Sequence, residues 1–461
     1  MGLNCDSQPV PRGRLLVIGA GYAGLATAIE LVLAGFEAEV VEAVSQLSTQ
    51  GDMIQIGSNA TRLMARWGNV VKEIQAISAQ PPTMTLFDKD GVELLTAPLP
   101  SEFDGYPVLF SNRGYIQKTV FEYARSIGVK FRFGSRVKSY FEDDTGAGII
   151  IGDERIRADA IIACDGIHSA ARKHLTGAQE LARPSGFAVY RSWFSLDRLA
   201  NHPLTKRFTE SKVDQFYVWI GTDIHVILFT TIAVRGAVVF VTHHDTYEME
   251  ESWTFPGDRQ DMLKVTEGWD PIIAAVISAI PQENIIDWKL LWRDPIKKWV
   301  SSKGRIAIAG DAAHPHLPTS GSGAAQAIED AGTFGALLDK LGQDRIPLAF
   351  QIFERIRYER TSLTQRMGWE TRHRWHQTDW AAVKVNPDYL KMPQPMWLYA
   401  HDARQYAYDQ CDAAVESLEK GKGFNSTNLP EGYTHEDWTV EMMLALEKNQ
   451  VQEHFYKVVN R

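Results

Sequence analysis

Asp311 lies between an apolar run and a turn of small residues, an arrangement suited to holding a negatively charged ligand. The run 306–309, Ile-Ala-Ile-Ala, predicts a buried strand, and 321–325, Gly-Ser-Gly-Ala-Ala, predicts the first turn of a helix. A carboxylate at a strand end can accept a hydrogen bond from a sugar-like hydroxyl, and glycines let backbone N–H groups approach a ligand at a positive helix end. A flavin fits, because its reduced ring carries negative charge near N1 and C2=O. The residues expected to bind it are Asp311, Gly321, Gly323 and Ala324.

A second glycine-rich turn lies near the N-terminus, directly after the apolar run 15–18, Leu-Leu-Val-Ile. In the segment 19–24, Gly19 permits a tight turn, Gly21 lets a pyrophosphate approach the backbone, and Gly24 lets helix and strand pack closely. An acid about 20 residues on is expected to bind the adenosine ribose hydroxyls. That acid is Glu42, with Ala43 beside it. Together these features favour dinucleotide binding over a plain helix-packing turn.

A third segment has Asp165-Gly166 after the apolar run 160–163, Ala-Ile-Ile-Ala. Alone it predicts only a turn that ends a strand. In this order, however, the three segments resemble the glycine, Asp-Gly and Gly-Asp motifs of the single-component FAD-dependent aromatic monooxygenases, the p-hydroxybenzoate- and salicylate-hydroxylase-like family. The resemblance implies that Asp165 contacts FAD, as does Arg113, which opens Arg-Gly-Tyr-Ile. It also implies NADPH or NADH as co-substrate, O₂ as oxidant and a small aromatic substrate.

The order of the motifs predicts a mixed α/β fold, in which a Rossmann-like FAD domain carries an inserted β-sheet domain and a helical C-terminal region. Periodicity predicts a βαβ unit over 14–44, a helix over 113–128, strands over 187–243 and a helix over about 347–378. The expected division is 1–182 for the first part of the FAD domain, 183–300 for the substrate domain, 301–380 for the return to the FAD domain, and 381–461 for a C-terminal helical extension.

Composition excludes several classes of protein. The net charge of −9, from 57 acidic against 48 basic residues, argues against nucleic-acid binding. The most apolar stretch, 224–241, is interrupted by His225 and Arg235, which predicts two strands and no membrane span. The N-terminus lacks the apolar region of a signal peptide, and the three cysteines form no Cys-x-x-Cys pair, so we expect a cytoplasmic protein. No His or Cys cluster has metal-ligand spacing, and no metal is expected.

Asp52 is the first candidate for substrate handling. Salicylate-hydroxylase-like proteins commonly have Gly-Ala-Gly-Ile at this segment and Pro before the Asn, so Asp52 and Ser58 are departures. The Asp52 departure resembles the fungal branch that oxidises prenylated indole alkaloids. A carboxylate in the substrate site would repel an aromatic acid by ~1–4 kcal/mol at contact and would favour a cationic amine or an indole N–H. The alternative is that Asp52 caps a turn and faces solvent.

Arg191, on the predicted strand that begins the substrate domain, is the second candidate. A strand arginine is most often a partner in a surface ion pair, but in similar fungal enzymes the matching position faces the substrate. A guanidinium stays charged, so it would stabilise an oxyanion that forms as an epoxide opens, or a bound phenolate. Both Arg191 and Asp52 are therefore assigned catalytic roles as a hypothesis.

Together with these residues, the resemblance implies an FAD monooxygenase of fungal secondary metabolism that oxidises the indole C2=C3 bond of an alkaloid, with rearrangement to a spiro-oxindole as a further step. An alternative within the class is hydroxylation of a phenolic polyketide or salicylate-like aromatic. An alternative of another class is an FAD-dependent hydride-transfer reductase, which would consume no O₂. Intact Asp165, Asp311 and Gly323 argue against a catalytically silent FAD-binding protein.

Overall fold

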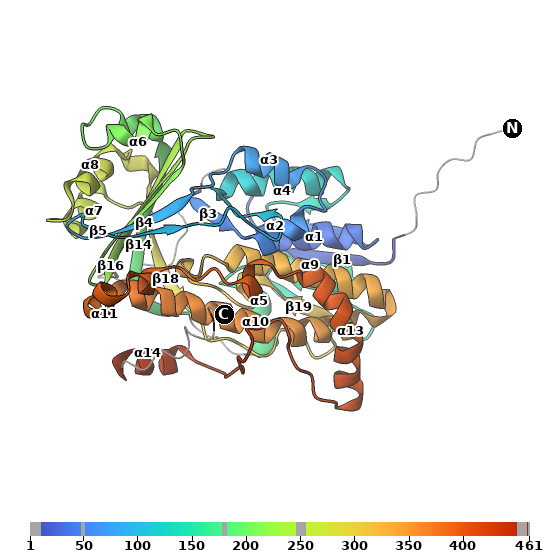
Figure 1. Ribbon diagram of the computed structural model, residues 1–461. Coiled ribbons are helices and arrows are strands. Elements are labelled where there is room, and N and C mark those ends of the chain that lie inside the picture. The colour runs from blue at the N-terminus through green and yellow to red at the C-terminus, as the bar shows by residue number, and fades with distance from the viewer. Residues whose placement is uncertain (1–10, 48–50, 178–181, 246–254, 450–458, 460–461) are drawn as a thin grey trace.

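The computed structural model describes residues 11–47, 51–177, 182–245, 255–449 and 459 (Figure 1). Cys5 and the N-terminal segment 1–10 lie outside these residues, as do the expectations that rest on them. Cys164 and Cys411 are both buried and unpaired by disulfide. Within the described residues, no helix is long and apolar enough to cross a membrane, and no group of three or more His, Cys, Asp or Glu side chains could hold a metal ion.

A parallel five-stranded sheet brings the three motifs together. The strand order is β19 (Ile306–Ile308), β13 (Ala160–Ala163), β1 (Arg14–Ile18), β2 (Glu37–Val41) and β9 (Lys130–Arg132). Every pairing in it is parallel. The carboxyl ends of parallel strands meet at one edge, so the segments that follow β1, β2, β13 and β19 meet there as well. The expected βαβ unit over 14–44 is present, with α1 (Tyr22–Leu33) between β1 and β2.

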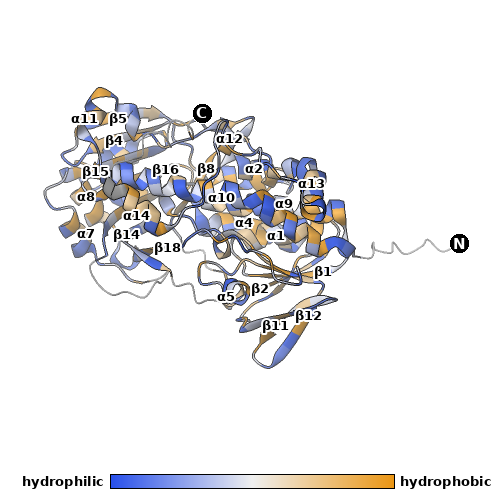
Figure 2. Ribbon diagram, turned by 90° about the horizontal axis from the view of Figure 1, so that it is seen from below, coloured by the Kyte–Doolittle hydropathy of each residue, from blue (hydrophilic) through white to orange (hydrophobic). Residues whose placement is uncertain are grey.

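Smaller elements surround this sheet. The antiparallel strands β10–β12 form a separate sheet that projects beside α5 (Figure 2). Two further strand pairs, β3 with β8 and β6 with β7, come from the segment between β2 and β9. Their bounds are β3 Met53–Ile56, β6 Glu102–Phe103, β7 Tyr106–Pro107, β8 Leu109–Asn112, β10 Ser139–Asp143, β11 Gly146–Ile151 and β12 Glu154–Ala158. The helices here are α2 Ser58–Met64, α3 Val70–Ala76, α4 Arg113–Ser126 and α5 Ala170–Thr176.

A seven-stranded, mostly antiparallel sheet forms the second part of the molecule. Its order is β18 (Ile285–Trp292), β14 (Arg183–Ser195), β17 (Gly236–His244), β16 (Ile224–Thr231), β15 (Gln215–Gly221), β4 (Thr83–Asp88) and β5 (Glu93–Pro98). The apolar stretch 224–241 forms the two strands β16 and β17, as its interruptions predict. The sheet also contains β4 and β5, which come from the range 1–182, because β4 pairs with β15 in parallel.

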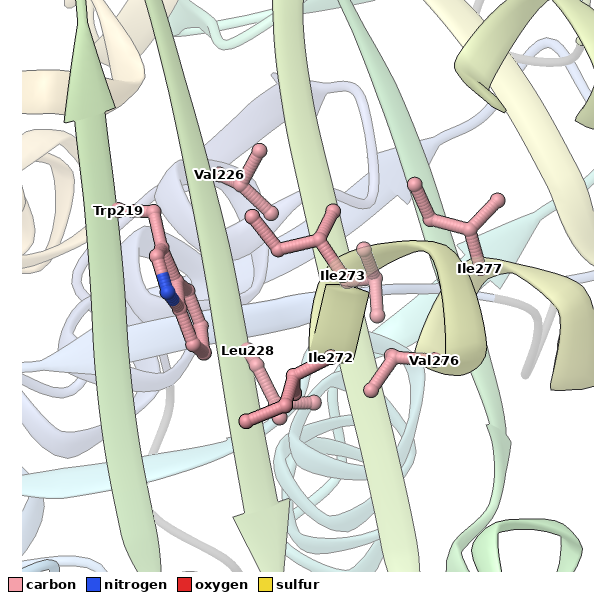
Figure 3. A pocket seen from close by; sticks show the side chains of 8 residues that line it. Trp219, Val226, Leu228, Ile272, Ile273, Val276 and Ile277 are labelled. Carbon is pink, nitrogen blue, oxygen red and sulfur yellow. The ribbon is translucent and has the colours of Figure 1, made fainter. Parts of the chain in front are cut away.

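The two faces of this sheet pack against different parts of the chain. One face packs under the short helices α6 (Lys206–Glu210), α7 (Arg259–Val265) and α8 (Pro271–Ala279), with η1 (Leu196–Leu199) and η2 (Gln282–Asn284) nearby. A small pocket on that side is lined by aliphatic side chains and the ring of Trp219 (Figure 3). Its one polar lining group, Trp219 Nε1, donates to Asp270 at 3.0 Å, so this pocket is a packing gap.

The opposite face, which carries Arg191, packs against the C-terminal third of the chain. The long helix expected over 347–378 is α10 (Ile346–His376), which contacts both α9 and the strands β15 and β16. Beyond it follow α11 (Trp380–Val385), η6 (Pro387–Leu390), α12 (Met396–Tyr399), α13 (Ala403–Lys420) and α14 (Val440–Asn449). We call residues 381–461 the C-terminal extension. Its Leu398 and Tyr399 are buried in the cluster on this face, so its aromatic segment is core there.

The helix after β19 begins later than the sequence predicts. The segment passes through η3 (Gly310–Ala312) and η4 (Pro318–Ser320), and α9 (Gly323–Leu341) starts at Gly323, with η5 (Gln343–Arg345) after its end. Gly321 was expected in the first helical turn. It instead ends η4 with φ +59°, a left-handed conformation that glycine adopts without strain.

Candidate active site

The turn between β1 and α1 is built around three glycines with different surroundings. Gly19 has φ +100°, and a Cβ there would lie 2.4 Å from the carbonyl oxygen of Cys164. A Cβ at Gly24 would lie 1.9 Å from the carbonyl oxygen of Gly19. At Gly21, by contrast, a Cβ would meet no protein atom within 4 Å. Gly19 and Gly24 therefore shape the turn itself, whereas Gly21 faces open space at the start of α1, where a phosphate group fits.

Glu42 is tied to this turn. Its carboxylate accepts hydrogen bonds from the backbone N–H of Ala20 at 2.7 Å and from that of Val44 at 2.9 Å, across the residue Ala43. Gln117 of α4 donates to the carbonyl oxygen of Ala20 at 2.7 Å. The glycine turn is thus held from both sides. Gln117 was missed in the sequence, although it follows Arg113 by one helical turn and so shares its helix face.

Asp165 follows β13 at the same sheet edge and organises the start of α5. Its Oδ2 accepts from the backbone N–H of Ala170 at 2.9 Å and from the Tyr140 hydroxyl at 3.2 Å. Burial raises the pKa of the Asp165 carboxyl, against hydrogen bonds from Ser169 and backbone N–H groups. The next residue, Gly166, has φ +78° and open space at its Cβ position. The turn expected from the sequence is present, and its Gly166 side is unobstructed.

Asp311 lies in η3, and its side chain is exposed. Asp330 of α9 holds the segment around Asp311 in place. Its Oδ2 accepts from the backbone N–H of Gly310 at 2.9 Å and lies 2.6 Å from His314 Nε2. No side chain caps the N-terminus of α9. The backbone N–H groups near Gly323 and Ala324 therefore remain directed at whatever lies before the helix, as binding of the flavin N1–C2=O region requires.

Arg113 begins α4 and connects the cofactor segments with Asp52. Its backbone N–H donates to the carbonyl oxygen of Asp52 at 2.9 Å, and its carbonyl oxygen accepts from the Tyr22 hydroxyl at 2.7 Å. The Arg113 side chain passes so close to Gly51 that a Cβ there would lie 2.4 Å from Arg113 Cγ. It interacts electrostatically with both Asp311 and Arg191. Arg113 is therefore positioned between the Gly-Asp motif and the seven-stranded sheet that carries Arg191.

Asp52 and Arg191 form a buried ion pair. Arg191 Nη1 donates to Asp52 Oδ2 at 2.6 Å, and the two residues are 5% and 8% exposed. The guanidinium carbon also lies 4.7 Å from the ring centroid of Trp288. Burial lowers the pKa of Arg191, and Asp52 opposes this effect. The alternative that Asp52 faces solvent is therefore wrong, and the ion pair of Arg191 is not on the surface.

The side chains around Arg191 are apolar and aromatic. In the register of the sheet, Arg191 lies opposite Phe240, Phe240 opposite Ile227, and Trp193 is two residues further along β14. These three neighbours share the face of Arg191 because side chains alternate along a strand. All three are only half-buried. The ion pair thus lies on an aromatic surface next to the segments expected to hold the flavin.

The residues present fit FAD. The open position at Gly21 and the uncapped start of α1 suit its pyrophosphate, the uncapped start of α9 suits the isoalloxazine C2=O, and no metal or covalent nucleophile is needed. These segments would hold FAD, which would supply the redox chemistry of the reaction. The arrangement therefore combines a flavin cradle with one buried, charge-compensated polar pair beside an aromatic surface.

Known proteins are similar to this sequence over most of its length. Residues 13–343 match the family model described as FAD binding domain. Asperlicin C monooxygenase of Petromyces alliaceus is 33% identical over 458 residues, which is 97% of this chain and 98% of that protein. Notoamide E oxidase notB' of Aspergillus versicolor is 31% identical over 450 residues, covering 92% and 97% of the two chains.

Solved structures agree. The crystal structure of FqzB superposes with a TM-score of 0.83 at 32% identity and covers 92% of this chain and 99% of its own. CtdE in complex with FAD and its substrate 4 gives a TM-score of 0.83 at 31% identity and covers 88% and 99%. A salicylate hydroxylase substrate complex, at 21% identity and a TM-score of 0.70, shares the fold. The α/β fold and the enzyme class expected from the motifs are confirmed: this chain belongs to the FAD-binding family of flavoprotein monooxygenases.

Proposed function

We propose that this enzyme uses NADPH or NADH and O₂ to insert one oxygen atom into the C2=C3 bond of an indole alkaloid. The observation that carries the proposal is the buried ion pair between Arg191 and Asp52, which lies beside the FAD segments. The names of the similar enzymes, asperlicin C monooxygenase and notoamide E oxidase, support an alkaloid substrate.

The pairing of Asp52 with Arg191 also favours a substrate without net charge. Asp52 was expected to repel an aromatic acid and to attract a cation. The Asp52 carboxylate already pairs with the Arg191 guanidinium at 2.6 Å, so the pair has no net charge. A charged ligand would therefore gain little Coulomb energy from either side chain. A salicylate-like acid would have to displace Asp52 from Arg191. A neutral aromatic ring with an N–H group fits best, because it can donate to a second lone pair of the carboxylate without breaking the ion pair.

The roles of the two side chains follow from their chemistry. Reduced FAD, when bound, supplies an activated oxygen atom derived from O₂, and the second oxygen atom leaves as water with the electrons of the nicotinamide. Asp52 accepts a hydrogen bond from the indole N–H and orients the C2=C3 bond. Arg191 donates to the oxygen on the substrate as the epoxide opens, where negative charge develops. A 1,2-shift from that opened state gives a spiro-oxindole without a further oxidant.

The ion pair also helps to hold the reacting oxygen. Burial of Arg191 among Trp288, Phe240 and Ile227 lowers the local dielectric response, so one hydrogen bond to a developing oxyanion stabilises it more than in water. Removal of one such donor from other enzymes lowers kcat by about 10²–10³-fold. We expect a loss of that order when Arg191 is replaced.

Arg191→Ala and Arg191→Lys test this assignment together. Both variants are prepared with FAD, and the product from a prenylated indole alkaloid is measured per bound FAD, because the proposal places Arg191 at the substrate and not in the flavin cradle. The expected result is a product loss of about 100-fold for Arg191→Ala, with FAD content close to that of the wild type. Equal losses of product and of FAD would contradict the assignment.

A further inference from the structure

The C-terminal extension reaches the flavin-facing segments through Tyr399. The Tyr399 hydroxyl accepts a hydrogen bond from Gln55 Nε2 at 2.8 Å, across 344 residues of sequence. Gln55 lies on β3, three residues after Asp52. Tyr399 is 4% exposed, whereas Gln55 is half-buried. The extension therefore supplies a buried partner to a side chain that itself remains accessible.

Gln55 is aimed at the turn before α9. A Cβ added at Gly321 would lie 3.2 Å from Gln55 Oε1 and 3.4 Å from Met392 Cε. The amide nitrogen is occupied by Tyr399, so the amide oxygen faces the Gly321 turn. Among the described residues, no group donates a hydrogen bond to this oxygen. A half-buried amide oxygen beside the flavin segments is suited to accept an N–H.

Gln55 also lies on the substrate side of β3. Side chains two apart on a strand share a face, so Gln55 points with Met53. Met53 packs against the cluster that covers the Arg191 face of the seven-stranded sheet. Gln55 lies about 10 Å along the backbone from Asp52, at roughly 3.3 Å per residue, so it is a contact point separate from the ion pair.

We propose that Gln55 binds the substrate, with its side-chain carbonyl accepting a hydrogen bond from a secondary amide N–H, and that Tyr399 is the positioning residue that fixes the Gln55 amide. This inference rests on the proposed function, because it names a second recognition point in the same site. It assigns the substrate class as an indole that also carries a secondary amide.

Tyr399 is held firmly enough for that role. Its carbonyl oxygen accepts from the Ser58 hydroxyl at 2.5 Å, and its ring stacks on Phe103 with centroids 4.8 Å apart. The preceding carbonyl oxygen, of Leu398, accepts from the buried guanidinium of Arg360 at 3.2 Å. Burial raises the pKa of the Tyr399 hydroxyl, so it remains protonated. Ser58, which departs from the usual Pro, thus helps to attach the extension to the site.

The test is a binding measurement on the FAD-loaded enzyme without NAD(P)H, so that no turnover occurs. The probes are cyclo-(Trp-Pro), an indole with one secondary amide, and its derivative methylated at that amide nitrogen. Dissociation constants are read from the change in flavin absorbance for the wild type, Gln55→Leu and Tyr399→Phe. The wild type should bind the N–H probe about 10-fold more tightly than the N-methyl probe, the ratio expected for one hydrogen bond.

The outcomes differ in the preference ratio, which is the dissociation constant of the N-methyl probe divided by that of the N–H probe. Gln55→Leu should bring it close to 1, and Tyr399→Phe should lower it about 3-fold, with FAD content unchanged in both. The matched control is Tyr406→Phe, which removes a hydroxyl that accepts from Thr427 elsewhere in the extension and should keep the wild-type ratio. A wild-type ratio in Gln55→Leu, or loss of its FAD, overturns the substrate contact, and a wild-type ratio in Tyr399→Phe overturns the positioning role. If the wild type binds neither probe, the proposed function fails together with this inference.

Discussion

The Asp52 carboxylate and the Arg191 guanidinium lie 2.6 Å apart, although 139 residues separate them in the chain. Asp52 directly precedes β3, beside the flavin segments, and Arg191 lies on β14 of the seven-stranded sheet. The ion pair therefore joins the two parts of the molecule at the place where we propose that cofactor and substrate meet. Because the pair is buried, its loss should affect the stability of the protein as well as its activity.

Because the Asp52–Arg191 pair is buried, removing one of its two residues should destabilise the protein more than replacing both. Asp52→Ala removes the carboxylate that pairs with the buried Arg191, and breaking a buried pair on one side typically costs about 3–5 kcal/mol of unfolding free energy. Replacing both residues by apolar ones should cost less than the sum of the single changes. Urea unfolding of the two single variants and the double variant measures this coupling. Asp143→Ala, which removes an exposed partner of Arg157, is the control and should leave the midpoint nearly unchanged.

The glycine turn predicts two different ways of losing FAD. Gly24→Ala places a Cβ 1.9 Å from the Gly19 carbonyl oxygen, so the turn itself must move and the thermal midpoint should fall along with FAD content. Gly21→Ala meets no protein atom within 4 Å, so the apoprotein should unfold like the wild type while its affinity for FAD drops. FAD titration and thermal unfolding of the apoproteins distinguish the two. Equal apoprotein midpoints for both variants would show that the Gly24 contact is not limiting.

The buried cation Arg360 predicts that the C-terminal extension is part of the folded core. Its guanidinium pairs with Glu329 at 2.8 Å and donates to the carbonyl oxygens of Leu398 and Asn428. Arg360→Met should leave Glu329 and these carbonyls with fewer partners and cost about 3 kcal/mol or more. The extension should also become sensitive to trypsin. Arg345→Met, at an exposed pair with Glu419, should behave like the wild type in both assays.

Glu370 predicts a pH dependence of stability. Burial raises the pKa of this carboxyl to about 7, although Arg366 and neighbouring cations act against the shift. A raised folded-state pKa means that the stabilisation is complete below the unfolded value of about 4.3 and is lost as the pH rises through 7. Relative to Glu370→Gln, the wild type should therefore lose about 3 kcal/mol between pH 4.5 and pH 8. Unfolding of both proteins at a series of pH values gives the difference, and a pH-independent difference would contradict the shift.

Local sequence patterns predict the elements of this fold well. The glycine turn at 19–24, the strand before Asp165 and the long helix α10 were all predictable, because each depends on residues close together in the chain. The start of α9 was placed two residues early, because Gly321 fits a helical turn and a left-handed turn equally well by composition. Only the backbone conformation of the preceding η4 decides between them.

Contacts between distant residues could not be predicted from the sequence. The burial of Asp52 depends on Arg191, and the orientation of Gln55 depends on Tyr399, in each case across more than a hundred residues. Likewise, β4 belongs to the seven-stranded sheet only because it pairs with the distant strand β15. Neither partner of such a contact shows a local signal, because burial and charge compensation arise only when the chain has folded.

The central claim is that this chain oxygenates an indole with electrons from a nicotinamide. The most direct measurement follows NADPH and O₂ consumption by the FAD-loaded enzyme with a prenylated indole alkaloid, and in parallel with salicylate, with mass-spectrometric analysis of the products. The account predicts that the indole alone stimulates consumption and yields a product about 16 mass units heavier, the increment of one oxygen atom. Stimulation by salicylate alone, or NADPH oxidation without O₂ uptake, would contradict it.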